Sequence, residues 1–247
     1  MQKKINFHFS VDDVLKSLIE VSDKKIKLKE HWFFLYLYKI YLKYNVKISL
    51  YLFFEENMDG KKRNLTHVRN LKNELNENWL YFGAHSLNYD KPLHSQTVLQ
   101  QKKDIKKIYK EIIRFAGKEL LASKVRLHQY SECYEIKDIL KTYNIKYLFT
   151  TDKNVGAHRL ESKNKKDLLL KGFTKYKGVN FIRTDLRVED MISKSFKKNI
   201  IDIKKIIKKK NFLIIYTHEY ELKKIICRTK FTSLLNLIAT TFKLKSY

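Results

Sequence analysis

Residues 7–14 read FHFSVDDV, an alternating apolar run that ends in two adjacent aspartates. The alternation predicts a β-strand over residues 5–9 (INFHF), which delivers the two aspartates to a loop. Two acids directly after such a strand have two interpretations. Either they begin the short helix that we expect over 13–22, or one carboxylate binds a divalent metal while the other acts as a base.

Short apolar runs recur along the rest of the chain, with longer helical patterns between them. We predict further strands over 46–54, 79–85, 125–128, 146–151, 179–184 and 212–217, and helices over 29–44, 61–76, 96–116, 135–143, 200–209 and 229–244. This alternation predicts parallel strands joined by right-handed crossovers. Seven strands in 247 residues favour a closed or nearly closed (β/α) barrel, which we expect to form one domain over 1–247.

Parallel barrels carry their chemistry at the carboxyl ends of the strands. The polar residues that fall at or soon after predicted strand ends are Asp12, Asp13, His85, Ser86, Asp90, His94, Arg126, His128, Asp152, Asp185, His218 and Glu219. Each has a structural alternative: a helix cap for the first two, a satisfied core residue for His85, a surface position for His94 and a core ion pair for Arg126. Their convergence favours a site. The remaining histidines, at 8, 31, 67 and 158, have no such context, and we interpret them as structural.

The chain carries 52 Lys and Arg against 26 Asp and Glu, a formal charge of +26. A field of this size attracts nucleic acid or anionic membrane surfaces. However, arginine is scarce, and basic runs such as 197–210 place isoleucines on the opposite helical face. We therefore favour solvated helix faces over a nucleic-acid-binding protein, and expect no nucleic-acid partner.

Other features point to a reducing compartment. The two cysteines, Cys133 and Cys227, form no CxxC motif, so we expect free thiols in the cytoplasm. The N-terminal residues lack the pattern of a signal peptide, and no run reaches the length of a membrane span. Peripheral membrane contact through the basic surface stays open, as does the oligomeric state.

Four segments, taken in order, resemble motifs of the NodB-homology polysaccharide deacetylases, carbohydrate esterase family four. The first motif, T-F-D-D-G, corresponds to 9–14 (FSVDDV), and the second, H-S/T-x-x-H, to 85–89 (HSLNY). The third, R-x-P-x, corresponds to 126–129 (RLHQ), and the fifth, an apolar strand ending in H-D/E, to 213–219 (LIIYTHE). Tyr89 stands in place of the second histidine of the second motif, and His128 in place of the proline of the third.

The resemblance implies a distorted seven-stranded (β/α) barrel and a divalent metal, usually zinc. It implies that Asp12 is the base, that His218 is the catalytic acid, and that Arg126 holds Asp12 ionised and in place. Asp13 and His85 correspond to metal ligands. Because of Tyr89, the third ligand must come from His94, Asp90 or His128.

We take His94 as the third ligand, and assign His128 and Asp185, the nearest counterpart of the fourth motif's acid, to substrate binding. The implied activity is removal of an N-acetyl or related acyl group from a carbohydrate, in the biosynthesis of a surface polysaccharide such as capsule or lipopolysaccharide. The implied substrate is an acetylated sugar, a sugar nucleotide or a lipid-linked saccharide. A barrel that has kept the fold and lost the chemistry is the alternative.

Overall fold

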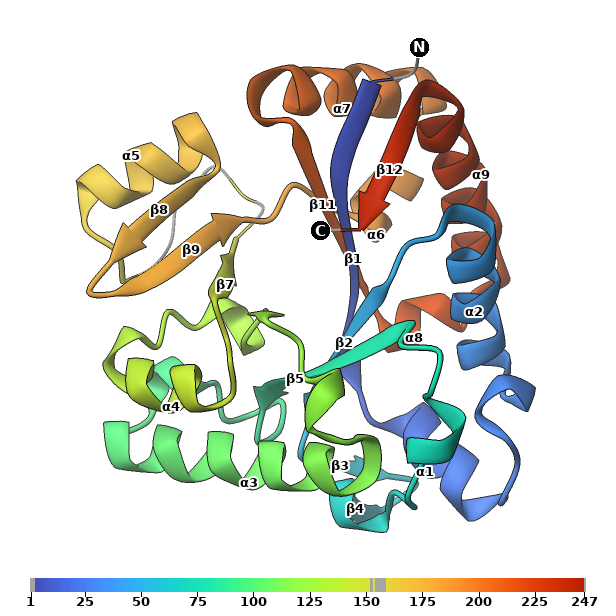
Figure 1. Cartoon of the computed structure of the whole chain (residues 1–247), viewed down its shortest axis with the longest axis vertical. Coiled ribbons are helices and arrows are strands. Elements are labelled where there is room, and N and C mark those ends of the chain that lie inside the picture. The colour runs from blue at the N-terminus through green and yellow to red at the C-terminus, as the bar shows by residue number, and fades with distance from the viewer. Residues whose placement is uncertain (1–2, 152, 154–158, 247) are drawn as a thin grey trace.

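The computed structural model describes residues 3–151, 153 and 159–246 (Figure 1). Each of the seven predicted strands has a counterpart, but the strand expected over 125–128 is confined to 124–125, because a 3₁₀ turn begins at His128. The counterparts are β1 (Lys3–Val14), β2 (Ile48–Phe53), β5 (Leu80–Ser86), β6 (Lys124–Val125), β7 (Tyr147–Thr150), β9 (Val179–Arg183) and β11 (Phe212–His218). Their neighbouring pairs run parallel, as predicted, in the order β11–β1–β2–β5 and β6–β7–β9.

The two sheets join at both edges into a distorted barrel, which confirms the predicted fold class. On one side, the amide of Ala122 donates to the carbonyl of Phe82 at 2.8 Å, beside an isolated parallel bridge between Phe82 and Leu121. On the other side, the amide of Asp185 donates to the carbonyl of Ile214 at 3.1 Å. Short strand pairing at these seams leaves the barrel irregular. Buried apolar side chains pack between the strands and the surrounding helices, as Phe9 does against Phe231, while polar side chains such as Ser10 and Arg126 are buried inside the barrel.

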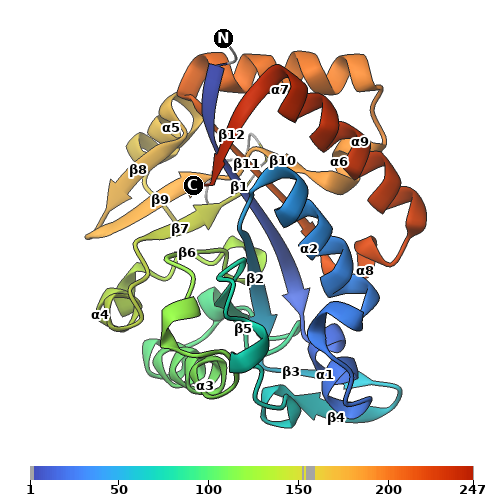
Figure 2. The same cartoon turned by 45° about the vertical axis from the view of Figure 1, so that its right-hand side comes forward.

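Helices cover the outside of the barrel, and β1 and β11 run side by side in its wall (Figures 1 and 2). The helices are α1 (Lys16–Asp23), α2 (Trp32–Tyr44), α3 (Val98–Ala116), α4 (Lys137–Thr142), α5 (Ser162–Lys171), α6 (Val188–Ile192), α7 (Phe196–Lys210), α8 (Glu219–Leu222) and α9 (Ile225–Thr241). Within the described residues, no helix is long and apolar enough to cross a membrane.

Two sequence predictions need correction. The helix expected over 61–76 is absent, because 55–64 form an antiparallel hairpin, β3 (Glu55–Met58) and β4 (Lys61–Asn64). Asp59 and Gly60 at its turn both have positive φ angles, the conformation that an Asp-Gly hairpin turn requires. The predicted C-terminal helix ends at Thr241, and the chain continues as β12 (Phe242–Ser246).

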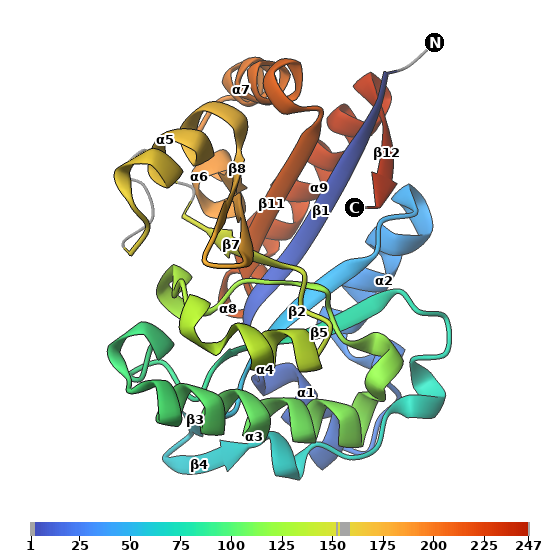
Figure 3. The same cartoon turned by 60° about the vertical axis from the view of Figure 1, so that its left-hand side comes forward.

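Three more short strands complete the fold: β8 (Phe173–Tyr176), β10 (Leu186–Arg187) and β12. Strand β12 pairs in parallel with the first residues of β1, from Lys3 to Phe7. The pairing of β2 with β1 begins further along, at Phe9. Figure 3 shows β12 beside the amino end of β1, at the opposite end of the barrel from the β3–β4 hairpin.

Candidate active site

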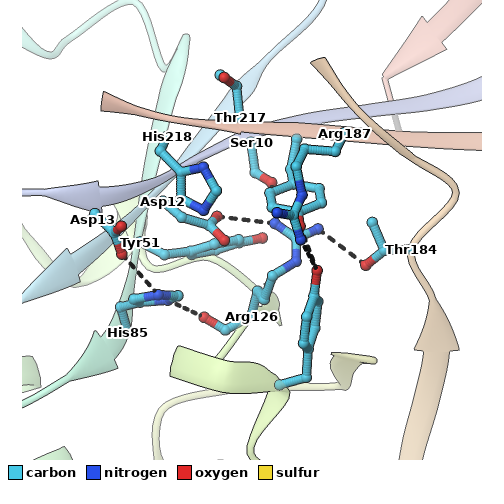
Figure 4. A network of polar contacts seen from close by, with 12 residues as sticks. Ser10, Asp12, Asp13, Tyr51, His85, Arg126, Thr184, Arg187, Thr217 and His218 are labelled. Carbon is cyan, nitrogen blue, oxygen red and sulfur yellow. Dashed lines mark hydrogen bonds and ion pairs between the residues drawn. The ribbon is translucent and has the colours of Figure 1, made fainter. Parts of the chain in front are cut away.

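A pocket of about 260 Å³ lies at the carboxyl ends of the strands, where a parallel barrel places its chemistry. Six of the predicted polar residues line it: Asp12, Asp13, His85, Arg126, His128 and His218. The other lining residues are Tyr89, Leu127, Gln129, Tyr130, Arg187, Tyr216 and Tyr220. Figure 4 shows the side chains of Asp12, Asp13, His85, Arg126 and His218, which come from separate segments of the chain and gather in one place.

A bulge at the end of β1 explains how two adjacent aspartates line one pocket. Successive side chains of a regular strand point to opposite faces. Here the pairing register of β1 with β2 shifts between Val11 and Val14, and Asp13 adopts a left-handed φ of 58°. Such a bulge re-aims a side chain. Asp12 and Asp13 therefore both reach the pocket, and neither caps α1.

His85 lies at a second bulge. The register of β5 with β2 passes from Ala84, opposite Leu52, to Ser86, opposite Phe53, so His85 has no partner in the ladder. Two residues earlier, a Cβ atom on Gly83 would lie 3.0 Å from Val125 Cγ2 and 3.1 Å from the Tyr51 ring. The absence of a side chain at Gly83 therefore allows β5 to approach its neighbours closely.

Two histidines contact backbone carbonyl groups, and these contacts show which ring nitrogen carries the hydrogen. His85 Nδ1 lies 2.7 Å from the carbonyl oxygen of Arg126, and His128 Nε2 lies 3.0 Å from that of Tyr89. A carbonyl can only accept, so each of these ring nitrogens carries the hydrogen. In the neutral rings, Nε2 of His85 and Nδ1 of His128 then carry lone pairs, and these two atoms are 3.2 Å apart.

Asp13 completes a set of three electron-donating atoms. Its Oδ1 is buried, lies 3.1 Å from Nε2 of His85, and makes no hydrogen bond there. The ligand atoms of Asp13, His85 and His128 all lie within 4.8 Å of one another. When both rings are neutral, these three electron-donating atoms repel one another unless a cation sits among them. One carboxylate and two imidazoles, the latter oriented by carbonyl partners, form a donor set that suits zinc and related divalent ions.

The pKa values of this cluster favour ligand-competent forms. Burial, helped by the neighbouring His85, lowers the pKa of His128 to about 4, so its ring is neutral at neutral pH. Burial alone would raise the pKa of Asp13, but the adjacent His85 outweighs it, and the pKa lies below its ordinary value. Asp13 is thus favoured as an anion and His128 as a neutral imidazole, the forms that bind a metal.

Arg126 forms a buried ion pair with Asp12. Its Nη1 lies 2.9 Å from Asp12 Oδ1 and donates at 2.9 Å to Ser10, while Nη2 donates at 3.2 Å to Thr184. Its guanidinium also lies 4.0 Å from the centre of the Tyr216 ring. Burial disfavours the charge of Arg126, but Asp12 outweighs this effect and the pKa of Arg126 rises. The pairing with Asp12 agrees with the expectation from the sequence.

His218 and Glu189 form a second charged pair at the pocket. The backbone partner of Asp12 on β11 is His218, whose Nδ1 lies 2.8 Å from Glu189 Oε1. Burial would lower the pKa of His218, but Glu189, Asp12 and Asp13 together raise it. The Tyr220 ring stacks on the imidazole at 5.1 Å. His218 thus favours the protonated form, as a general acid needs.

Two predicted residues lie away from this cluster. His94 Nδ1 lies 2.9 Å from Ser131 Oγ, and His94 does not line the pocket. We had assigned the third position of the donor set to His94, but His128 occupies that position. Asp185 is buried in an ion pair with Lys210 and accepts from the amide of Ile214 at 2.8 Å. Burial raises the pKa of Asp185.

Two of the strand-end acids need separate mention. Asp90 is exposed, beyond the residues that line the pocket. Asp152 lies outside the described residues, as does His158.

The sequence did not single out several residues at the pocket. Glu189 belongs to an ordinary acidic pair at the start of α6, and Arg187 lies on the two-residue strand β10. Tyr130 contacts the Tyr216 hydroxyl and accepts from Arg187 at 3.2 Å. In a chain with 16 tyrosines, nothing marks Tyr130 or Tyr216 before the fold is known.

Comparison with known proteins identifies the fold. The chain matches no family model and no curated protein. Among solved structures, it is similar to a peptidoglycan N-acetylglucosamine deacetylase, with a TM-score of 0.51, 12% identity, and coverage of 100% of this chain and 87% of that one. It is also similar to a mutant of a family-four pseudoenzyme with restored enzymatic activity, with a TM-score of 0.51, 12% identity, and coverage of 99% and 66%.

A third similar structure is the 4-alpha-glucanotransferase from Thermococcus litoralis, with a TM-score of 0.56 and 13% identity. The match covers 99% of this chain, which spans 40% of that protein's length. At these identities the likenesses show the fold. They confirm that the resemblance to family-four deacetylases holds in three dimensions, and that this fold carries both active enzymes and a pseudoenzyme.

Proposed function

We propose that this protein is a divalent-metal-dependent hydrolase that removes an N-acetyl or related acyl group from a carbohydrate, as a divergent relative of the family-four deacetylases. One observation carries the proposal. The ligand atoms of Asp13, His85 and His128 converge within 4.8 Å of one another, next to two further charged pairs in the same pocket.

In this proposal Asp13, His85 and His128 hold the ion, and zinc suits this donor set. His128 thus takes the role that we had assigned to His94. A bound divalent ion would polarise the acyl carbonyl as a Lewis acid, and it would lower the pKa of water so that hydroxide is available as a nucleophile at neutral pH. Tyr89 contributes its backbone carbonyl, which fixes the ring of His128, in place of a histidine side chain.

The other pocket residues supply the proton transfers. Asp12 accepts the proton of the attacking water, and Arg126 fixes one of its oxygens through a charge-assisted hydrogen bond. His218 delivers a proton to the departing amine, and Glu189 holds its ring through Nδ1. Base and acid thus come from neighbouring strands, since Asp12 and His218 are register partners.

The rim of the pocket suits a sugar. Tyr89 and Tyr220 are 65% and 52% exposed and line the pocket, so each offers an apolar ring face and a hydroxyl group. We propose an acetylated sugar, sugar nucleotide or lipid-linked saccharide as substrate, in surface-polysaccharide biosynthesis. The two buried free cysteines agree with a cytoplasmic setting.

Acetate release from a panel of N-acetylated sugars and sugar nucleotides tests the proposal. We expect zinc-loaded enzyme to release acetate from at least one of them, and a chelator to abolish the release. Asp12→Asn should lower the rate by about 100-fold or more while metal stays bound. Asp90→Asn, which changes an exposed acid beyond the pocket, is the matched control and should keep the rate. Near-full activity of Asp12→Asn would show that the base is assigned wrongly.

A further inference from the structure

A second and larger hollow, of about 630 Å³, lies at the opposite end of the barrel. Its walls come from the amino ends of β1, β2, β5 and β6 and from β12, which runs beside β1 (Figure 3). The carboxyl-end pocket shares no lining residue with it. Its volume falls in the range of sites that bind small molecules. The proposed deacetylase chemistry makes no use of this hollow.

The charge of this hollow is one-sided. Five lysines line it and no described acidic residue does; they are Lys4, Lys47, Lys124, Lys243 and Lys245. They come from four separate segments, so the fold, rather than one basic run, gathers them. The excess of lysine in the chain does not by itself produce such a site. A hollow of similar size, about 680 Å³, beside the β3–β4 hairpin is lined by Glu55, Glu56, Asp59 and Asp90 as well as two lysines.

Polar groups on the wall and floor add hydrogen-bonding capacity. Ser49, Ser123 and Ser246 line the hollow, and the Tyr81 hydroxyl accepts from Lys47 Nζ at 3.1 Å. His8 lines it too, although its side chain is only 4% exposed.

A hydrogen bond with Tyr51 fixes the orientation of the His8 ring. Tyr51 gives its hydroxyl proton to the carbonyl of Lys124 at 2.8 Å, so its oxygen accepts from His8 Nε2 at 3.2 Å. The floor of the hollow is therefore an ordered polar surface.

The lysines of this hollow repel one another in the absence of an anion. Burial, together with the positive charge of Lys146, lowers the pKa of Lys124. Lysine amino groups bind phosphate as compact point charges, and several of them around one cavity match a group with two or more negative charges. Serine hydroxyls are hydrogen-bond donors, which phosphate oxygens accept.

We infer that this hollow, which we call the basic mouth, binds a phosphate-bearing ligand through Lys4, Lys47, Lys124, Lys243 and Lys245. The ligand is either a soluble phosphate ester or the headgroup of an anionic lipid. Because the basic mouth is at the far end of the barrel from Asp13 and His85, its occupant is not the group undergoing hydrolysis. The inference does not depend on the proposed function.

Two binding assays with one pair of variants test the inference. The first variant, Lys4→Ala/Lys243→Ala/Lys245→Ala, removes three exposed lysines of the basic mouth. The control, Lys103→Ala/Lys106→Ala/Lys110→Ala, removes the same charge from exposed positions on α3. Circular dichroism and thermal melting verify that both fold. Calorimetry at low salt measures affinity for inorganic pyrophosphate, and sedimentation measures binding to phosphatidylcholine vesicles with and without phosphatidylglycerol.

We expect wild type and control to bind alike, and the first variant to bind at least about tenfold more weakly. If the difference appears with pyrophosphate and no vesicle binds, the natural ligand is a soluble phosphate ester. If it appears with phosphatidylglycerol vesicles, the ligand is a lipid headgroup. Equal weakening in both variants would assign binding to the overall charge, and it would overturn the inference. Absence of binding to either probe would overturn it as well.

Discussion

Replacing Arg126 with methionine would leave the carboxylate of Asp12 buried without a positively charged partner. The side chains of Arg126 and Asp12 are 2% and 3% exposed, and Nη1 lies 2.9 Å from Oδ1. Unit charges about 4 Å apart attract by about 4 kcal/mol at an effective dielectric constant of about 20. Methionine keeps much of the volume and none of the charge. We therefore expect Arg126→Met to lower the free energy of unfolding by about 3–5 kcal/mol, the usual effect of breaking a buried pair from one side.

The double variant separates the ion pair from the packing. Asp12→Asn in the Arg126→Met background removes the stranded charge, so the double variant should be more stable than Arg126→Met alone. Urea denaturation followed by circular dichroism at neutral pH, with a chelator present, gives the free energies for a double-mutant cycle. A loss below about 1 kcal/mol for Arg126→Met, or strictly additive losses, would refute the reasoning.

Two further predictions concern acids that support the pocket. Glu189→Gln should lower the pKa of His218 and so move the alkaline limb of the pH–rate profile to lower pH, because a general acid works only below its pKa. An alkaline limb that does not move would contradict this prediction. Glu219, the first residue of α8, accepts from the Leu15 amide at 3.0 Å and the Ser17 amide at 2.7 Å, so it caps the start of α1. Glu219→Ala should lower the free energy of unfolding by about 2 kcal/mol or more, and Glu219→Gln should lower it by less than half of that. Equal losses for the two variants, measured by urea denaturation, would argue against the cap.

The barrel could be predicted because its signals are local. Most of the longer parallel strands are apolar runs, and β2 and most of β11 are buried on both faces. Several of the helices between them are long enough to show their periodicity. The region 61–76 was assigned wrongly for a local reason as well. Its apolar spacing suits a helix, but the Asp59-Gly60 turn and the Asn64 side chain, which accepts from the Thr66 amide at 2.9 Å, favour a hairpin followed by a 3₁₀ turn.

The site was harder to predict, because it depends on bulges and on contacts between distant segments. Asp12, Asp13, His85, Arg126 and His218 could be found, since each ends a strand. Whether His94 or His128 completes the donor set depends on which segment lies across the carboxyl ends of the strands. The sequence distance of nine residues between His85 and His94 says nothing about that, whereas His128 is 43 residues away and lies 3.2 Å from the His85 ring.

Glu189 was missed for a related reason. It contacts His218 across 29 residues and from a short helix that has little periodicity of its own.

The metal content of His128→Ala compared with that of His94→Ala tests the central claim most directly. Both substitutions remove a histidine near the strand ends, and one of them removes a proposed ligand. Elemental analysis of untagged protein after incubation with zinc should find about one ion per chain in wild type and in His94→Ala, and little in His128→Ala or His85→Ala. Full metal content in His128→Ala, its loss in His94→Ala, or a wild type without metal would contradict the site described above.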